Sequence, residues 1–253
     1  MNFDEALSNA CSALLLAKQN NFDIRYRFTS EHETDAPLYI IPGIKGDVSL
    51  YGYEWESLIE KVREGAVLYV SMDYCAVTNF TELFGVEVSG REMRSAPAIV
   101  ELDGEKFTIP AEVKTYLNVL SGEVLAREAD GNPVFVRNKF GKGWCYLLTV
   151  PMEKAAGNIP GAFHKAEQPA WRKFYAPLAE HVKSRRRITC ENPLVTLTEH
   201  PESDSVCWAV AVTNSPEVAN VEFVLDAKWQ AEEALNVEIQ PFAAKLLKLV
   251  SAN

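Results

Sequence analysis

The sequence has little of what a nucleic-acid-binding protein needs. Its formal net charge is -10, because 35 Asp and Glu outnumber 25 Lys and Arg. Binding to a polyanion requires a broad basic surface. The one dense basic run, Lys183–Arg187, is typical of a solvated helix end. We therefore predict no nucleic-acid partner.

Long hydrophobic runs are also missing. No apolar stretch approaches the roughly 20 residues that a membrane helix needs. The first ten residues, MNFDEALSNA, carry acids where a secretion signal carries lysine or arginine. For the chain as given, we therefore expect no membrane contact and a cytoplasmic location. This expectation would not hold for a piece of a longer secreted protein.

Cysteine is scarce and scattered. The five cysteines, at positions 11, 75, 145, 190 and 207, are odd in number and form neither a CxxC pair nor a Cys/His cluster. The histidines at positions 32, 181 and 200 are isolated in sequence as well. We expect reduced, mostly buried thiols, with no metal and no cofactor.

What the sequence does contain is a globular composition, 47% hydrophobic, with helices and strands in alternation. Residues 3–20 and 54–64 repeat apolar side chains at three- and four-residue spacing, which predicts two helices. Residues 22–28 alternate, which predicts a strand. The short apolar runs 38–41 and 66–71 predict strands buried on both faces. This order predicts an α/β fold with an open, mostly parallel sheet of flavodoxin type.

After residue 84 the alternation of helices and strands gives way to short extended segments. Short extended pieces with a hairpin at Asp103-Gly104 predict a β insertion from Phe84 to Pro110. A second hairpin, with its turn at Asp130–Pro133, predicts a return to the sheet through residues 144–150.

A helix from about Ala170 to Lys183 is expected to end the α/β domain, which we place at residues 1–186. Residues 187–253 show short strands without helical periodicity, which predicts a small antiparallel β-sandwich. Three or four helices are too few for an eightfold βα barrel, which needs eight strand-helix pairs.

Three groups of segments carry a family resemblance. LYIIPG at 38–43 leads through a helix to GAVLYVS at 65–71, and NKFGKGWCYLLTV follows at 138–150. The third group joins Leu197–Asn214 with Glu238–Leu249. Together they resemble the C-terminal region of β-galactosidases and related glycosidases. In that family a catalytic barrel precedes a class I amidotransferase-like trimerisation domain and a small β domain.

The resemblance implies a non-catalytic, structural or oligomerisation region of a glycoside hydrolase. Its implied partners are further copies of the chain or a glycosidase catalytic barrel. Glycoside hydrolysis needs two carboxylates held a defined distance apart, and in that family both lie on the barrel. We therefore expect this chain alone to hydrolyse no glycoside.

The amidotransferase likeness raises an alternative function, an amidase that uses Cys75. This residue follows the strand ending at Ser71, near the place of that fold's nucleophile. His164 and Glu167 follow the strand ending at Val150, near the place of its base and orienting acid. The residues beside Cys75 include no glycine for a nucleophile elbow, which favours a packed thiol.

A second alternative is a stand-alone carbohydrate-binding protein. Flat aromatic rings suited to a sugar or a protein partner occur at Tyr51, Trp55, Trp171 and Tyr175. The helical spacing of the last two with Phe174 and Leu178 favours core or interface packing. We expect any protein-binding surface to lie on the β insertion and on the stretch from Trp171 to Leu178.

Overall fold

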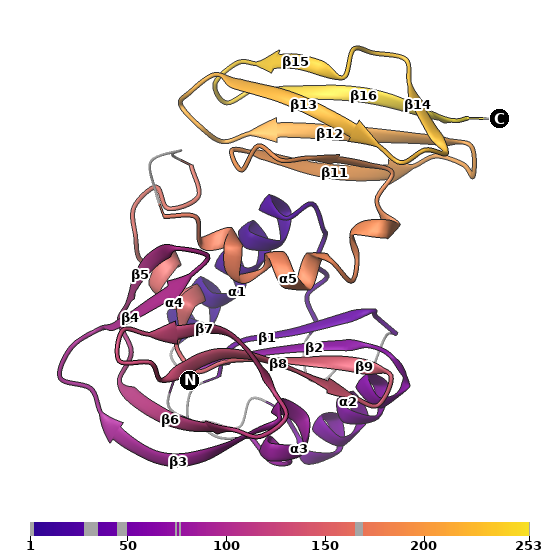
Figure 1. Cartoon of the computed structure of the whole chain (residues 1–253). Helices are drawn as coiled ribbons and strands as arrows, with labels where there is room; N and C mark the ends of the chain where they lie inside the picture. Colours follow the sequence, from indigo (N-terminus) through magenta and orange to yellow (C-terminus); the bar gives the residue numbers. More distant parts are fainter. Residues whose placement is uncertain are drawn as a thin grey trace. The chain divides into compact units, whose positions relative to one another are not determined.

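The computed structural model describes residues 3–27, 35–44, 50–73, 75, 77–164 and 169–252 (Figure 1). The chain divides into two compact units. Unit 1 comprises residues 1–13 and 26–159, and unit 2 comprises residues 14–25 and 160–253. The predicted β domain, 187–253, therefore lies within unit 2. The residues that precede it from 160 onward belong to unit 2 as well.

A seven-stranded sheet forms unit 1 (Figure 1). Strands β1, β2 and β9 pair in parallel, and the other four continue the sheet in antiparallel pairings. The mostly parallel sheet predicted from the sequence is therefore found only for β1, β2 and β9 of its seven described strands. In spatial order the strands are β1 (Leu38–Ile44), β2 (Val67–Met72), β9 (Gly143–Leu148), β8 (Pro133–Phe140), β7 (Glu123–Glu128), β4 (Ala98–Leu102) and β5 (Glu105–Ile109).

Tight turns explain why the sheet becomes antiparallel. The β4–β5 turn is Asp103-Gly104, at φ 50° and 73°, as the sequence predicts. The β8–β9 turn is Gly141-Lys142. Two-residue connections can join only antiparallel neighbours.

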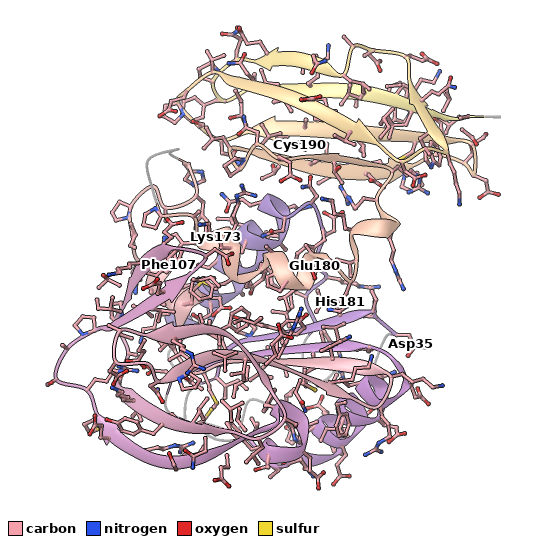
Figure 2. The ribbon with its side chains drawn as sticks, viewed as in Figure 1. Asp35, Phe107, Lys173, Glu180, His181 and Cys190 are labelled. Carbon is pink, nitrogen blue, oxygen red and sulfur yellow. The ribbon has the colours of Figure 1, made fainter. Side chains whose placement is uncertain are left out.

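The predicted β insertion is divided between two sheets. Strand β3 (Val86–Met93) pairs with β6 (Val113–Val119) in a separate antiparallel ribbon, whereas β4 and β5 belong to the main sheet. Phe107 on β5 is completely buried and is labelled in Figure 2. The insertion is therefore part of the core of unit 1 as well as of its surface.

Helices of unit 1 pack against this framework. Helix α2 (Gly52–Glu64) buries Trp55, Leu58, Ile59 and Val62, which are its apolar stripe, and ends at Gly65 with φ 135°. Strand β2 is buried along its whole length, as its continuous apolar run predicts. Two shorter helices, α3 (Phe80–Phe84) and α4 (Met152–Gly157), complete this set.

Helix α1 (Phe3–Gln19) contributes residues to both units. The strand predicted for residues 22–28 is wrong over its described part, because residues 22–27 form no strand. Asn21 turns the chain at φ 61°. Its side chain is hydrogen-bonded to strand β10 (Ile188–Cys190) of the same unit. These tertiary bonds override the local alternation.

The helix predicted from about 170 to 183 is broken into three pieces. They are η1 (Trp171–Phe174), α5 (Ala176–Ala179) and η2 (Lys183–Arg185). Pro177 lies in the first turn of α5, where its missing N–H is tolerated. The periodicity correctly predicted the buried face, since Trp171, Phe174, Tyr175 and Leu178 are all buried.

The C-terminal part of unit 2 is built from two antiparallel sheets (Figure 1). One has the order β10-β13-β15, and the other has the order β11-β12-β16-β14. Their shared core includes Leu197, Ala209, Phe223 and Leu249. The remaining bounds are β11 (Val195–Pro201), β12 (Val206–Thr213), β13 (Ala219–Leu225), β14 (Trp229–Ala231), β15 (Asn236–Ile239) and β16 (Ala244–Ser251).

Candidate functional site

Cys75 lies just beyond the end of β2 and is partly buried. Its Sγ lies 3.5 Å from the Ile44 carbonyl oxygen and 4.0 Å from the Met72 sulfur. Arg91 Nη2 donates to the Cys75 carbonyl at 3.0 Å. A thiol directed at a backbone carbonyl is typical of a packed cysteine.

The other two members of the predicted triad are less defined. His164 belongs to unit 2, whereas Cys75 belongs to unit 1. The His164 backbone N–H donates to the Gly161 carbonyl at 3.0 Å in a turn. Glu167 lies outside the described residues. The Cys75, His164 and Glu167 triad therefore stays a prediction.

Of the aromatic residues at the start of α2, Tyr51 is accessible and Trp55 is not. Tyr51 is 56% exposed and stacks on Tyr53, with ring centroids 5.7 Å apart. Trp55 is 8% exposed, and its indole N–H donates to the Thr78 carbonyl at 3.3 Å. Among the described residues at this position, Tyr51 and Tyr53 are the exposed aromatic side chains.

Trp171 and Tyr175 are closed off. Their exposed fractions are 2% and 0%. Trp171 stacks with Phe174, and Tyr175 stacks with Phe22 at 6.3 Å. The structure thus favours internal packing for these rings over the predicted sugar-binding or protein-binding surface.

Buried carboxylates are the groups best placed to have unusual chemistry, and each described one is held by the protein. Glu54 accepts from the Tyr51 N–H at 2.9 Å, which caps α2. Asp73 accepts from the Glu112 N–H at 2.9 Å. Glu128 receives two hydrogen bonds from Arg94. These contacts assign structural roles to the three groups.

Glu153 is the most deeply buried of these acids and lies on α4. Tyr69 Oη donates to its Oε1 at 2.7 Å, and Ser71 Oγ donates to its Oε2 at 2.6 Å. The Gly43 N–H in turn donates to Ser71 Oγ at 2.7 Å. The network joins β1, β2 and α4 within unit 1 where the parallel strands end.

Sequence reasoning did not identify the Glu153 network. The available signal was the alternation that places Tyr69 and Ser71 on one face of β2. Nothing in the sequence shows that an acid 82 residues beyond Ser71 meets that face. Because all three side chains are fully buried, we assign the network to stability rather than to substrate binding.

The GKG element within NKFGKGWCYLLTV is a packing motif. A Cβ atom on Gly143 would lie 2.0 Å from the Ala66 carbonyl oxygen and 2.3 Å from that of Val62. Gly141, at φ 57°, approaches the Arg63 backbone in the same way. The glycines therefore let the β8–β9 turn touch the end of α2.

Neither a metal centre nor a membrane span is found in the parts of the chain that the structure describes. No cluster of three or more His, Cys, Asp or Glu side chains there is suited to hold a metal ion. Among the described helices, none combines the length and apolar character needed to cross a bilayer. The described cysteines are all free thiols.

Comparison with known proteins shows similarity of fold. No family model and no curated protein sequence matches the chain. A β-galactosidase from Bacillus circulans sp. alkalophilus matches 100% of this chain with a TM-score of 0.59 at 15% identity. A catalytic mutant of Gan42B, a GH42 β-galactosidase from G. stearothermophilus, matches 84% of it with a TM-score of 0.56 at 16% identity. The chain has a β-galactosidase-like fold.

The similarity extends to other glycosidases. Alpha-L-fucosidase isoenzyme 2 from Paenibacillus thiaminolyticus matches 96% of the chain, with a TM-score of 0.66 at 10% identity. In each case the match covers only part of the larger protein. It spans 38% of the Bacillus enzyme, 31% of the Gan42B mutant and 45% of the fucosidase.

Proposed function

We propose that this chain is a non-catalytic accessory region of a glycoside hydrolase of the β-galactosidase type. The observation that carries the proposal is the unequal coverage of the matches. Nearly all of this chain is matched, whereas about a third of each β-galactosidase is. The remaining two thirds of those enzymes are long enough to hold a catalytic barrel.

The contacts of the buried acids support the same proposal. A glycosidase needs an acid and a second carboxylate facing a substrate across an open cleft. Glu54, Asp73, Glu128 and Glu153 are instead engaged by backbone N–H groups, arginine or hydroxyl groups of unit 1. These carboxylates therefore stabilise the fold of unit 1.

We further propose that unit 1 mediates self-association or contact with a catalytic barrel. In this view β1, β2 and β9 correspond to the parallel part of a class I amidotransferase-like, flavodoxin-type sheet. The β3–β6 ribbon would supply the contact surface. Val88 and Val119 lie on one face of that ribbon and are 37% and 39% exposed, and Leu120 beside it is 58% exposed. Exposed apolar groups of this kind are common in contact surfaces.

The accessory role is tested by assaying purified chain against a panel of nitrophenyl glycosides. We expect no turnover. Hydrolysis that a single Asp or Glu substitution in this chain abolishes would overturn the accessory role. Fast alkylation of Cys75 at neutral pH, together with amidase activity lost in Cys75→Ala, would favour the alternative enzyme.

The contact surface is tested by light scattering at micromolar concentration. We expect a dimer or trimer that Leu120→Glu dissociates. The matched control is Val224→Glu on β13, since Val224 is 56% exposed but lies in unit 2. A monomer at all concentrations that also fails to bind an added β-galactosidase barrel would reject the contact surface.

A further inference from the structure

A pocket of about 290 Å³ opens on unit 1 beside the loop that joins β3 to β4. Five charged side chains contribute to its lining, and they come from β3, β6 and β7 and from the residues that follow β3 and β7. They are Glu92, Arg94, Lys114, Glu128 and Asp130. The proposed assembly role uses none of them.

Ion pairs hold these side chains in place. Arg94 donates to both oxygens of Glu128, at 2.9 and 2.6 Å, and both side chains are 6% exposed. Lys114 is hydrogen-bonded to Asp130 and lies 3.9 Å from Glu128. Tyr116 donates to Glu92 at 2.5 Å. The polar groups of the pocket are thus fixed before a ligand arrives, which lowers the entropic cost of binding.

The pocket keeps both donors and acceptors for a ligand. Lys114 has three N–H groups, of which one bonds to Asp130. Glu92 uses Oε1 for Tyr116, which leaves Oε2 as an acceptor among the described contacts. The bond between Lys114 and Asp130 raises the pKa of the lysine and lowers that of the aspartate. Both groups therefore stay charged at neutral pH.

This arrangement favours a neutral ligand over an ionic one. Arg94 is paired with Glu128 and Lys114 with Asp130, while Glu92 accepts from Tyr116, so an added anion meets three carboxylates and an added cation meets Arg94 and Lys114. A hydroxyl group both donates and accepts. A ring with several hydroxyl groups can therefore bond to Glu92 and Lys114 at the same time.

Apolar side chains complete the lining. Met93 is 68% exposed and Ile99 is 37% exposed, and Pro97 lies between them in sequence. Such groups pack well against the C–H face of a sugar. The volume is close to the lower end of the usual range for ligand pockets, about 300 Å³. It suits one ring better than an extended glycan.

We propose that this pocket binds a single monosaccharide unit. The pocket lies at the Met93–Val113 end of the β3–β6 ribbon, whereas Val119 and Leu120 of the proposed contact surface lie at its other end. The binding does not depend on self-association, so Leu120→Glu should leave it unchanged.

The test is a titration of the purified chain with galactose, glucose and mannose. Binding of each sugar is measured by ligand-observed saturation-transfer NMR. For about 12 heavy atoms we expect a Kd on the order of 1 to 10 mM for at least one sugar. Inorganic phosphate and glycine serve as charged probes. We expect them to bind at least about tenfold more weakly.

Two variants locate the binding. Ala96→Trp places a large ring in an exposed position of the pocket rim and should weaken the sugar Kd at least about tenfold. Glu92→Gln should weaken it about threefold. The matched control is Ala227→Trp, in an exposed turn of unit 2, which should change nothing.

Three results would overturn the proposal. One is the absence of saturation transfer to any of the three sugars. Another is sugar binding that Ala96→Trp leaves intact, because the ligand would then bind elsewhere. The third is tighter binding of phosphate or glycine than of every sugar. The accessory role would survive each of these results, since the glycoside assay tests it separately.

Discussion

Asn21 and Cys190, 169 residues apart, exchange two hydrogen bonds. Asn21 Nδ2 donates to the Cys190 carbonyl at 2.7 Å, and the Cys190 N–H donates to Asn21 Oδ1 at 2.9 Å. Both residues are buried in unit 2, and Figure 2 labels Cys190. The asparagine side chain thus pairs with the short strand β10 as a neighbouring strand would. This pairing joins the end of α1 to the β-sandwich.

Replacing Asn21 tests this connection. Asn21→Gly keeps the left-handed backbone but leaves a buried N–H and a buried carbonyl without partners. We expect a loss of about 2 to 4 kcal/mol in the free energy of unfolding, measured with urea. Asn21→Ala should lose about 1 kcal/mol more, because alanine disfavours φ 61°. A glycine variant as stable as the parent would show that the two bonds contribute nothing.

The close approach at Gly143 gives a second prediction. Gly143→Ala would push a methyl group into the carbonyl oxygens of Val62 and Ala66. We expect a loss of about 3 kcal/mol or more, seen as a lower urea midpoint or as insoluble protein. The control is Lys142→Ala, whose side chain is exposed and which should change stability by less than about 0.5 kcal/mol. Equal stability of the two variants would contradict the packing role of the GKG element.

The Glu153 network gives a third prediction. Glu153→Gln keeps the side-chain volume but offers one acceptor oxygen where two hydroxyl groups now donate. Ser71 already accepts from the Gly43 N–H and would face a second donor. We expect a loss of about 1 to 3 kcal/mol in the free energy of unfolding. Exposed Glu180→Gln is the control and should be neutral. Matching urea midpoints for the two variants would count against the network.

Buried thiols should make the protein less stable at high pH. Burial raises the pKa of Cys145 to about 12 and that of Cys190 to about 11. In the unfolded chain a thiol ionises near pH 8.5. The folded state therefore binds more protons above that pH, and stability falls between about pH 8.5 and 11. Each thiol contributes a slope of at most about 1.4 kcal/mol per pH unit.

The contribution of one thiol is isolated by substitution. Cys190→Ala should flatten the fall in unfolding free energy above about pH 9, measured with urea from pH 7 to 11. Cys11→Ala is the control, because it removes an exposed thiol in place of a buried one. A Cys190→Ala slope identical to that of the parent would show that this thiol does not titrate on unfolding.

Local patterns were sufficient for several elements. The apolar stripe predicted helix α2, because a helix buried on one face repeats apolar residues every three or four positions. The continuous apolar run predicted strand β2, because a strand buried on both faces is apolar at every position. The turn at Asp103-Gly104 was predictable because few residue pairs adopt its backbone geometry. The strands predicted at 206–212 and 245–250 are present as β12 and β16, which are buried at alternate positions.

Long-range contacts determined the rest. Residues 22–27 alternate like a strand, yet Asn21 binds β10 and Phe22 stacks on Tyr175, so no strand forms. The periodicity at 171–178 identified the buried face but not its break at Pro177. Burial of Trp171 depends on neighbours that the sequence does not specify.

The sequence by itself determined the kinds of element, their order and the apolar face of each, because these follow from spacing along the chain. Only the tertiary structure decided which acids meet which partners. Glu153 reaches Ser71 and Arg94 reaches Glu128 across gaps of 82 and 34 residues. Such pairings depend on strand order and on the close approach of backbones, which residue spacing does not encode. The candidate pocket was also decided by the tertiary structure alone, since its charged lining is assembled from strands β3, β6 and β7.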